Sequence, residues 1–178
     1  MKRIGLVGVF LILIGCVKDV DFNQMDAVEI KPVYIASIAY FDLVGNDFLD
    51  EDLNELAHIE DFILTQIKGN NVENIAKLEF TFVFSNSFPR DFLATVFFLD
   101  ASGNLVYQFE PVIEIMRNTE NVKTVITVEQ PDIETIYKAA RAGFFMQLIS
   151  DENNVITPET PGVLNLKSSL TLYLNVKK

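Results

Sequence analysis

The clearest pattern in the chain is an alternation of apolar and polar residues close to its carboxyl end. From Leu164 to Val176 every second residue is apolar, except Ser168. The residues at the alternate positions, from Asn165 to Lys177, are mostly polar and include Lys167 and Lys177. A period of two places successive side chains on opposite faces of a β-strand. We therefore predict a strand over this segment with one face in the core. Its register should be firm, because a shift by one residue would bury both lysines.

Further strand signals lie in the middle of the chain. In Leu78–Ser85, one leucine and three phenylalanines occupy alternate positions and so share one face. The segment Phe92–Leu99 is apolar on both faces, as expected of a central strand. Segments rich in β-branched and aromatic residues predict more strands, at Val33–Phe41, Ile59–Ile67, Leu105–Phe109, Val112–Met116, Val122–Val128 and Phe144–Ile149.

The segment Ile59–Ile67 is ambiguous, because a short apolar run fits a strand or a helix equally well. The turn residues of Lys68–Asn71 follow it and favour a strand. Similar clusters of turn-forming residues separate the other strands, at Gly45–Asp47, Asn86–Arg90, Asp100–Asn104 and Asp151–Gly162.

One short helix is predicted after Pro131, a residue suited to the first turn of a helix. Asp132 and Glu134 would lie in that turn, where the helix dipole favours acidic side chains. Gly143 is a plausible residue at which the helix stops. The apolar stripe of this helix would consist of Ile133, Ile136, Tyr137 and Ala140.

Seven to nine short strands with turns between them, and no alternation of strands with helices, predict an all-β fold. We expect an antiparallel β-sandwich of immunoglobulin-like architecture and Greek-key type, with one short crossover helix. An incomplete barrel is the alternative. Immunoglobulin-like refers to architecture alone, since the chain has one cysteine and no tryptophan, and so lacks the characteristic disulfide and core tryptophan.

Composition and charge narrow the class of partners. The 178 residues are 49% hydrophobic and include 15 phenylalanines, which is typical of a folded domain rather than a disordered tail. The formal net charge is −11, so the surface should repel phosphate backbones, and nucleic acid is not an expected partner. We interpret the acidity mainly as a source of solubility.

The first sixteen residues have the order of a secretory signal. Lys2 and Arg3 form a basic start, the apolar run Ile4–Ile14 follows, and Gly15 and Cys16 end the segment. The apolar run is too short to cross a bilayer core of roughly 30 Å.

The sequence Leu13-Ile14-Gly15-Cys16 resembles the lipobox of bacterial lipoproteins. The resemblance implies cleavage between Gly15 and Cys16 and a diacylglycerol on the Cys16 thiol; no other cofactor is expected. We then expect a signal peptide over 1–15, a lipidated cysteine and tether over 16–26, and a single β-sandwich domain over 27–178. The alternative is a chance cysteine at the end of an ordinary signal peptide or membrane anchor.

The acidic segment Val17–Asp26 loosely resembles the signals that follow the anchor cysteine in some surface-exposed lipoproteins of Bacteroidota. There a lysine precedes adjacent acids, whereas here Val20 interrupts the pair, and a plain spacer is the alternative. As a whole, the chain resembles small envelope lipoproteins of Bacteroidota that have no assigned activity. This implies a lipid anchor in the cell envelope, at the outer membrane, with the periplasmic and surface faces both open.

One acidic stretch, Asp50–Asp61, invites comparison with a calcium loop. Asp50, Asp52, Asn54 and Asp61 fall at the first, third, fifth and twelfth positions of such a loop, and calcium prefers oxygen ligands. The sixth position, which needs glycine, is a glutamate here, and the twelfth is the shorter aspartate. These four residues are weak metal candidates, and a solvated acidic loop or a capped helical turn is the favoured interpretation.

Catalytic signals are few. His58 is the only histidine, and no serine stands in a nucleophile-elbow context beside which it could act as a base. Zinc would need several histidine or cysteine ligands. A pair of carboxylates could in principle cleave a glycoside, but nothing in the sequence marks one pair among 25 acidic residues. Tyr107, Tyr137 and Tyr173 could stack on a sugar, although Tyr173 fits an ordinary outward strand position.

These observations leave two functional hypotheses. The first is a non-catalytic binding or structural module, held at a membrane by a lipid anchor, that binds a protein or a glycan through its loops. The alternative is a calcium-dependent binder or a hydrolase that uses the acids of Asp50–Asp61.

The lipid-anchor hypothesis makes a direct prediction about Cys16. Two or more acyl chains hold a protein stably on a bilayer. A protein without the acceptor thiol receives no diacylglycerol and so loses this anchor. Cys16→Ser should therefore move the protein from the membrane fraction to the soluble fraction, as measured by immunoblotting after a high-salt wash. A variant that stays with the membranes would count against the anchor.

Overall fold

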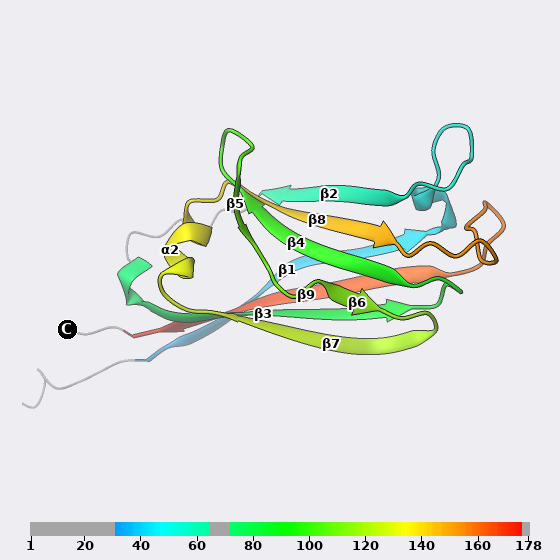
Figure 1. The fold of residues 1–178 in the computed structure, drawn as a ribbon. Coiled ribbons are helices and arrows are strands. Elements are labelled where there is room, and N and C mark those ends of the chain that lie inside the picture. Colours follow the sequence, from blue (N-terminus) through cyan, green and yellow to red (C-terminus); the bar gives the residue numbers. More distant parts are fainter. Residues whose placement is uncertain (1–30, 65–71, 176–178) are drawn as a thin grey trace, which may run out of the picture. The chain divides into compact units, whose positions relative to one another are not determined.

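Two antiparallel sheets form the part of the chain that the computed structural model describes, residues 31–64 and 72–175 (Figure 1). The predicted all-β sandwich is confirmed. The nine strands within these ranges are β1 (Val33–Val44), β2 (His58–Leu64), β3 (Ile75–Asn86), β4 (Phe92–Leu99), β5 (Leu105–Gln108), β6 (Ile113–Ile115), β7 (Thr119–Val128), β8 (Arg141–Leu148) and β9 (Val163–Leu174). The helical segments there are η2 (Gly45–Phe48), η3 (Val72–Asn74) and α2 (Asp132–Tyr137).

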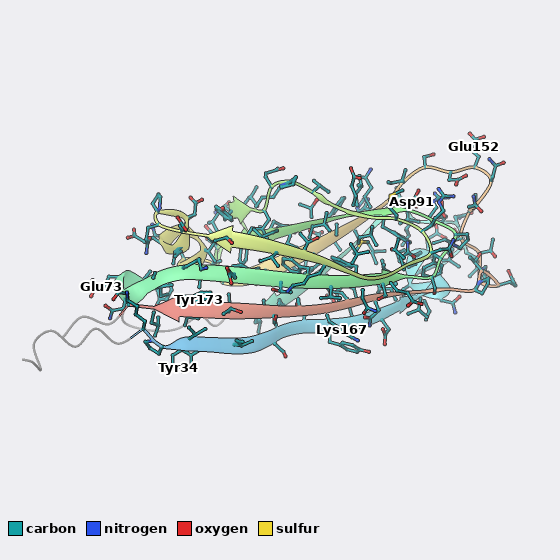
Figure 2. The ribbon with its side chains drawn as sticks, turned by 90° about the horizontal axis from the view of Figure 1, so that it is seen from below. Tyr34, Glu73, Asp91, Glu152, Lys167 and Tyr173 are labelled. Atoms are coloured by element: carbon teal, nitrogen blue, oxygen red, sulfur yellow. The ribbon has the colours of Figure 1, made fainter. Side chains whose placement is uncertain are left out.

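The chain passes repeatedly between the sheets. The first sheet has the strand order β1-β9-β3-β7, and the second has the order β2-β8-β4, with β5 and β6 both pairing with β4. Consecutive strands such as β3 and β4, β6 and β7, or β8 and β9 therefore lie in different layers, as Figure 1 shows. Figure 2 views the first sheet from its outer face, with Tyr34 and Tyr173 at one end and Asp91 and Glu152 at the other.

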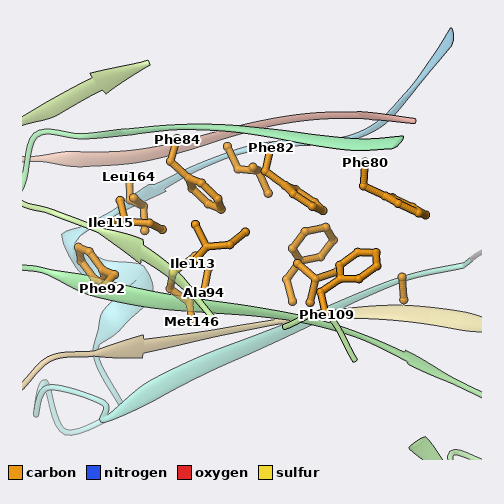
Figure 3. Close-up of a cluster of buried hydrophobic side chains, with 14 of the residues drawn as sticks. Phe80, Phe82, Phe84, Phe92, Ala94, Phe109, Ile113, Ile115, Met146 and Leu164 are labelled. Atoms are coloured by element: carbon orange, nitrogen blue, oxygen red, sulfur yellow. The ribbon is translucent and has the colours of Figure 1, made fainter. Parts of the chain in front are cut away.

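The core between the sheets is dominated by phenylalanine. The aromatic residues of β3 that the alternation assigns to one face, Phe80, Phe82 and Phe84, are all buried (Figure 3). Their rings meet aromatic residues of the opposite layer: the ring centroids of Phe80 and Phe109 are 4.9 Å apart and those of Phe82 and Phe144 are 6.2 Å apart. Tilted and edge-on contacts of this kind are favourable beyond the burial of area alone.

The central position of β4 is confirmed, because β8 pairs along one of its edges and β5 and β6 along the other. Its outer face carries Phe97, which lies opposite Gly143 of β8. A Cβ atom on Gly143 would approach the Phe97 ring to 2.3 Å. The prediction that Gly143 ends a helix is therefore wrong: this glycine is a strand residue that leaves room for a neighbouring ring.

The predicted helix is present, but it ends before Ala140, the last residue of the predicted apolar stripe. α2 follows Pro131 and ends at Tyr137, with Lys138 as its C-terminal cap. Ile133 and Ile136 are buried, and Asp132 and Glu134 lie in the first turn as predicted. Ala140 lies beyond the helix, where its N–H donates to the carbonyl of Leu99, so strand pairing already directs the chain there. No helix within the described ranges combines the length and the apolar character that crossing a bilayer requires.

The strand predicted near the carboxyl end is confirmed as β9, which pairs with both β1 and β3. Its predicted last residues, 176 and 177, lie outside the described residues. Ser168 faces the core among leucines because it serves a β-bulge in β1, where the pairing register shifts between Ser37 and Tyr40. The Ala39 N–H donates to Ser168 Oγ at 3.0 Å, and Ser168 Oγ donates to the Ala39 carbonyl at 3.1 Å.

The remaining strands differ from their predictions mainly in length. β1 extends to Val44, beyond the predicted Phe41, and β7 begins earlier than predicted, at Thr119. β6 is shorter, with only Ile113–Ile115 paired. β2 is a strand, which settles the ambiguity of 59–67 for the residues up to Leu64. The rest of that segment and the turn predicted at Lys68–Asn71 lie outside the described residues.

The bulge predicts a large effect for a small change at Ser168. Ser168→Ala removes the partner of both backbone groups of Ala39, and a buried polar group without a partner costs about 1–3 kcal/mol. We expect the free energy of unfolding in urea to fall by that amount, with no change in the slope against denaturant. Ser169→Ala, on the other face of β9, is the matched control and should change it by less than about 0.5 kcal/mol. Equal losses would contradict this role of the hydroxyl.

Candidate functional site

The two sheets do not close against each other on the side where β1 and β2 lie. Within the described residues, β1 pairs only with β9 and β2 pairs only with β8, so each is the last strand of its sheet. Both strands contribute side chains to the same hollow, which shows that the two free edges face a common opening. We call this opening the lateral groove.

The lateral groove consists of two hollows that share Phe144 of β8. The larger has a volume of about 490 Å³, and the smaller about 200 Å³. The walls of both are mainly apolar, and part of the phenylalanine core forms the floor of the smaller one. The larger is lined by Phe41, Leu43, Leu56, Ile59, Phe144 and Met146 together with polar rim residues, and the smaller by Ala36, Ser37, Ile38, Leu64, Phe80, Val96, Phe98, Ala142, Phe144 and Leu170.

The groove has a local cause in the sequence of β1. Large rings in the middle of the sandwich, such as Phe80 and Phe98, keep the sheets apart. On the β1 side, the smaller hollow is bordered by the short side chains of Ala36 and Ser37, just before the bulge. Short side chains cannot fill the space that the rings create, so this side of the core stays open.

The rim of the groove is acidic. Asp47 of η2 and Glu60 and Asp61 of β2 line the larger hollow together with His58, and no lysine or arginine is among the described residues that line either hollow. Asp61 shares a face of β2 with the inward-packed Ile59 and Ile63, so its charge lies beside apolar walls. The result is an apolar channel with negative charge along one border.

The backbone edges of the two strands are not equally available. In β2, the Phe62 N–H donates to Asp61 Oδ1 at 2.8 Å, so this donor is already bound. In β1, the Val44 N–H donates to Asp47 Oδ2 at 2.7 Å. The preceding segment Val33–Phe41 has no charged residue and no proline, and several of its apolar side chains are exposed, with Ile35 75% exposed and Tyr40 65%.

The acidic residues considered for calcium belong to a turn and a strand. Asp50 Oδ1 accepts hydrogen bonds from the backbone N–H groups of Asp52 at 2.9 Å and Asn54 at 2.8 Å. The bond from the Asn54 N–H is the main reason why the pKa of Asp50 lies below its ordinary value. Asp61 is in β2, bonded to the Phe62 N–H as described above. The described residues contain no group of three or more acidic, histidine or cysteine side chains that could hold a metal.

The same turn occurs a second time, which explains the calcium-like spacing. Asp100 accepts from the N–H groups of Ser102 at 2.8 Å and Asn104 at 2.9 Å, as Asp50 does from Asp52 and Asn54. In both turns the fourth residue has a positive φ, 86° at Gly103 and 63° at Leu53. An aspartate and an asparagine four residues apart thus close a tight loop by hydrogen bonds to the backbone.

A polar network that the sequence did not reveal ties the loops together at one end of the sandwich. Arg90 is only 3% exposed, and its Nη1 donates to the carbonyls of Asp151 at 2.7 Å and Asn154 at 2.8 Å. Its Nη2 pairs with Glu55 Oε2 at 2.8 Å, while Glu55 Oε1 accepts from the Ile156 N–H at 2.7 Å. One guanidinium therefore joins three loops that are far apart in the sequence.

A second arginine strengthens the same end. Arg117 Nε and Nη2 bind Asp91 side by side at 3.0 and 2.7 Å, and its Nη1 reaches Asp151 Oδ2 at 3.1 Å. The hydrogen bonds from Arg117 hold the pKa of Asp91 below its ordinary value, and the fixed fork of arginine suits this two-point contact. The sequence did not reveal this network, because its distinguishing feature is the burial of charged residues. A loop sequence has no periodic pattern from which burial could be predicted.

The candidate catalytic and sugar-binding residues do not come together in one site. His58 stacks on Phe145 of β8 with ring centroids 4.7 Å apart, on the rim of the lateral groove. The Tyr107 hydroxyl donates to Asp132 Oδ2 at 3.0 Å, whereas the Tyr173 hydroxyl donates to Glu79 in the other sheet. Cys16 and Gly15 lie outside the described residues, so the anchor and the cleavage site stay predictions.

Comparison with known proteins supports the fold and goes no further. No family model and no curated protein sequence matches the chain. A protein from Parabacteroides distasonis that is described as secreted is similar to it with a TM-score of 0.51 at 13% identity, over 65% of this chain and 37% of that one. The present chain therefore spans only about a third of that structure, and at this identity the likeness shows the fold alone.

More distant similarities involve proteins of unrelated kinds. The VP2 subviral particle of infectious bursal disease virus matches with a TM-score of 0.42 at 12% identity, over 82% of this chain and 33% of that one. The CBM22-1 xylan-binding domain of Xyn10C from Paenibacillus barcinonensis matches with a TM-score of 0.32 at 11% identity, over 67% of this chain and 83% of that one. Matches this weak carry no functional argument.

The pairing of Asp91 with Arg117 predicts a pH-dependent contribution to stability. Because the folded pKa of Asp91 is depressed below its ordinary value of 3.8, the pair stabilises the fold fully above that value, and the contribution is lost as the pH falls through the folded pKa. A double-mutant cycle with Asp91→Asn and Arg117→Gln, measured by urea unfolding, should give a clear coupling free energy at pH 7 that declines only as the pH is lowered below 3.8. A coupling already lost between pH 7 and pH 4 would contradict this assignment.

Proposed function

We propose that this protein is a non-catalytic envelope module, anchored to a membrane through lipid on Cys16, that binds a polypeptide segment of another protein in its lateral groove. The observation that carries the proposal is the groove itself: an opening with mainly apolar walls between the edges of the two sheets, whose larger hollow has a volume of about 490 Å³. Concave, mostly apolar sites of this size are typical of ligand-binding regions.

The choice of the groove over the loops follows from the polar network. Binding loops on a sandwich are usually free to adapt, but here Arg90 and Arg117 hold the loops around Glu55, Asp91 and Asp151 by ion pairs and hydrogen bonds. Their polar groups are directed to one another. Exposed apolar side chains run along β1 and β2, at Tyr34, Ile35, Tyr40, Phe62 and Leu64, and single ones, Leu53, Met116 and Val155, are exposed at the loop end.

The choice of a polypeptide over a glycan follows from the chemistry of the walls. Sugar-binding surfaces offer hydrogen-bonding side chains beside exposed aromatic rings, whereas the walls here are aliphatic and phenylalanine side chains with acids at the rim. Apolar side chains of a peptide would bury area against these walls at about 25 cal/mol per Å². The leader Leu13-Ile14-Gly15-Cys16 supports an anchor, and Val17–Asp26 would tether the module at the membrane.

A tryptophan placed in the groove tests this function directly, since the chain has no tryptophan of its own. Phe41→Trp, with Leu56→Trp as a second reporter, puts an indole on the groove wall, and Val125→Trp puts one on exposed β7 as the control. With β-casein or reduced, amidomethylated lysozyme as unfolded probes, we expect a saturable emission change from the groove reporters alone. Dextran should give none.

The outcome that would overturn this function is equally clear. Groove reporters that stay unchanged with both polypeptides, or that respond no more than the β7 control, would show that the groove does not bind polypeptide. Circular dichroism of each variant, matched to the unmodified protein, ensures that the comparison is made between folded molecules.

A further inference from the structure

We propose that the segment bound in the groove is a basic, extended peptide of a partner protein, which pairs with the free edge of β1 and so adds a fifth strand to the first sheet. This inference rests on the proposed function and specifies its partner. Three independent observations lead to it: the available backbone edge, the alternating space beside it, and the charge around it.

The backbone edge points to β1 rather than β2. β1 is 12 residues long and pairs only with β9 among the described residues, so its other side presents N–H and carbonyl groups that no described strand binds. Free edges are normally protected by charges, prolines, β-bulges or short length, and β1 has one of these, the bulge between Ser37 and Tyr40. Val33–Phe41 has neither charge nor proline, and the β1 donor bound by Asp47, the Val44 N–H, lies at the far end of the strand. β2 has only seven residues, and the donor bound by Asp61, the Phe62 N–H, lies within it.

The shape of the groove suits an extended chain. An added strand directs alternate side chains to one face, about 7 Å apart, and the other side chains to solvent. The two hollows lie one after the other along β1, the smaller beside Ala36 and Ile38 and the larger beside Phe41 and Leu43. Alternate apolar side chains of a bound strand would therefore enter both hollows in succession, which is the geometry of peptide recognition by strand addition.

The charge of the rim selects a basic partner. Asp47, Glu60 and Asp61 border the larger hollow, and the whole chain carries a net charge of −11. A second copy of the chain would bring the same negative charge to the groove. The protein's own segment Val17–Glu29 has one lysine against four acids, so it is also a poor match. In a peptide with lysine or arginine between its apolar residues, the apolar side chains would pack on the groove walls and the basic side chains would pair with the acids of the rim.

Synthetic peptides separate these requirements. The probe is acetyl-KVKVKVKVK-amide, and its matched controls are the acidic peptide EVEVEVEVE, the block peptide KKKKKVVVV of identical composition, and a copy of the probe that is N-methylated at every residue, so that no backbone N–H of its nine residues can donate. In calorimetry at 0.15 M salt, we expect the probe to bind at least about tenfold more tightly than each control, a difference of about 1.4 kcal/mol. Hydrogen exchange should slow in β1 and not in β7, which is the edge strand on the other side of the same sheet.

Protein variants test the groove from the other side. Ala36→Leu fills the smaller hollow and Asp61→Asn removes one rim charge, and each should weaken the probe several-fold. Glu120→Gln, an exposed carboxylate on β7, is the control and should leave affinity unchanged. Equal affinity for the basic and acidic peptides, unchanged binding after N-methylation, or protection of β7 would each overturn the proposal, as would dimerisation of the free protein through β1 in sedimentation experiments.

The two levels of the hypothesis fail in different ways. If the groove tryptophans respond to unfolded polypeptide while the alternating basic peptide shows no preference, only strand addition by a basic segment is wrong. If the tryptophans respond to no polypeptide, the proposed function is wrong as well.

Discussion

The separation of the two sheets depends on phenylalanine. Rings from β3 on one layer meet rings from β4, β8 and the segment after β5 on the other, and these contacts fix how far apart the layers stand. That spacing is set in the middle of the sandwich and holds across its whole width, because strands are bonded rigidly to their neighbours. Where the inward residues are large, the space is filled. Where they are short, as at Ala36 of β1, the same spacing produces the lateral groove.

The polar network at the loop end is the counterpart of this apolar core. Arg90 is nearly inaccessible and satisfies two carbonyls and one carboxylate, although its Nε has no hydrogen-bond partner within the described residues. Removing one member of a buried ion pair leaves the other charge without compensation, which costs more than the pair itself contributes. The loops at this end are therefore joined by interactions that depend on one another, whereas the β1 side has exposed apolar residues and an edge that no other described strand pairs with.

Much of this fold follows from local pattern. The alternation in 78–85 and 164–174 determines which side chains of β3 and β9 face the core, and the apolar run of β4 correctly indicates a central strand. Local pattern fails where a residue serves a distant one. Gly143 resembles a helix stop until Phe97 is seen to occupy the space above it, and Ser168 resembles a gap in the apolar face until the bulge in β1 gives its hydroxyl two partners.

The candidate site could not be predicted for the same reason. No sequence pattern states that β1 and β2 end their sheets on the same side, because strand order is decided by pairing between segments more than a hundred residues apart, such as β1 with β9. The acids of 50–61 stood out by spacing, yet of the four metal candidates only Asp61 borders the groove, and Asp50 and Asn54 close a turn that recurs at Asp100–Asn104. The spacing of Asp50 and Asn54 along the chain thus follows from the backbone geometry of a turn.

An exposed edge strand with a long uncharged stretch, such as Val33–Phe41 of β1, is ordinarily a risk, because it can pair with the edge of another copy. Here the risk is limited by charge at a distance: copies that each carry a net charge of −11 repel one another before their edges meet. The same field attracts a segment of opposite charge to the acidic rim. An apolar, neutral stretch of edge strand surrounded by negatively charged residues therefore distinguishes polypeptides by their charge. It disfavours pairing with a second acidic copy and favours pairing with a basic strand. In this view the acidity of the chain has a second role besides solubility, because it determines which polypeptides can reach β1.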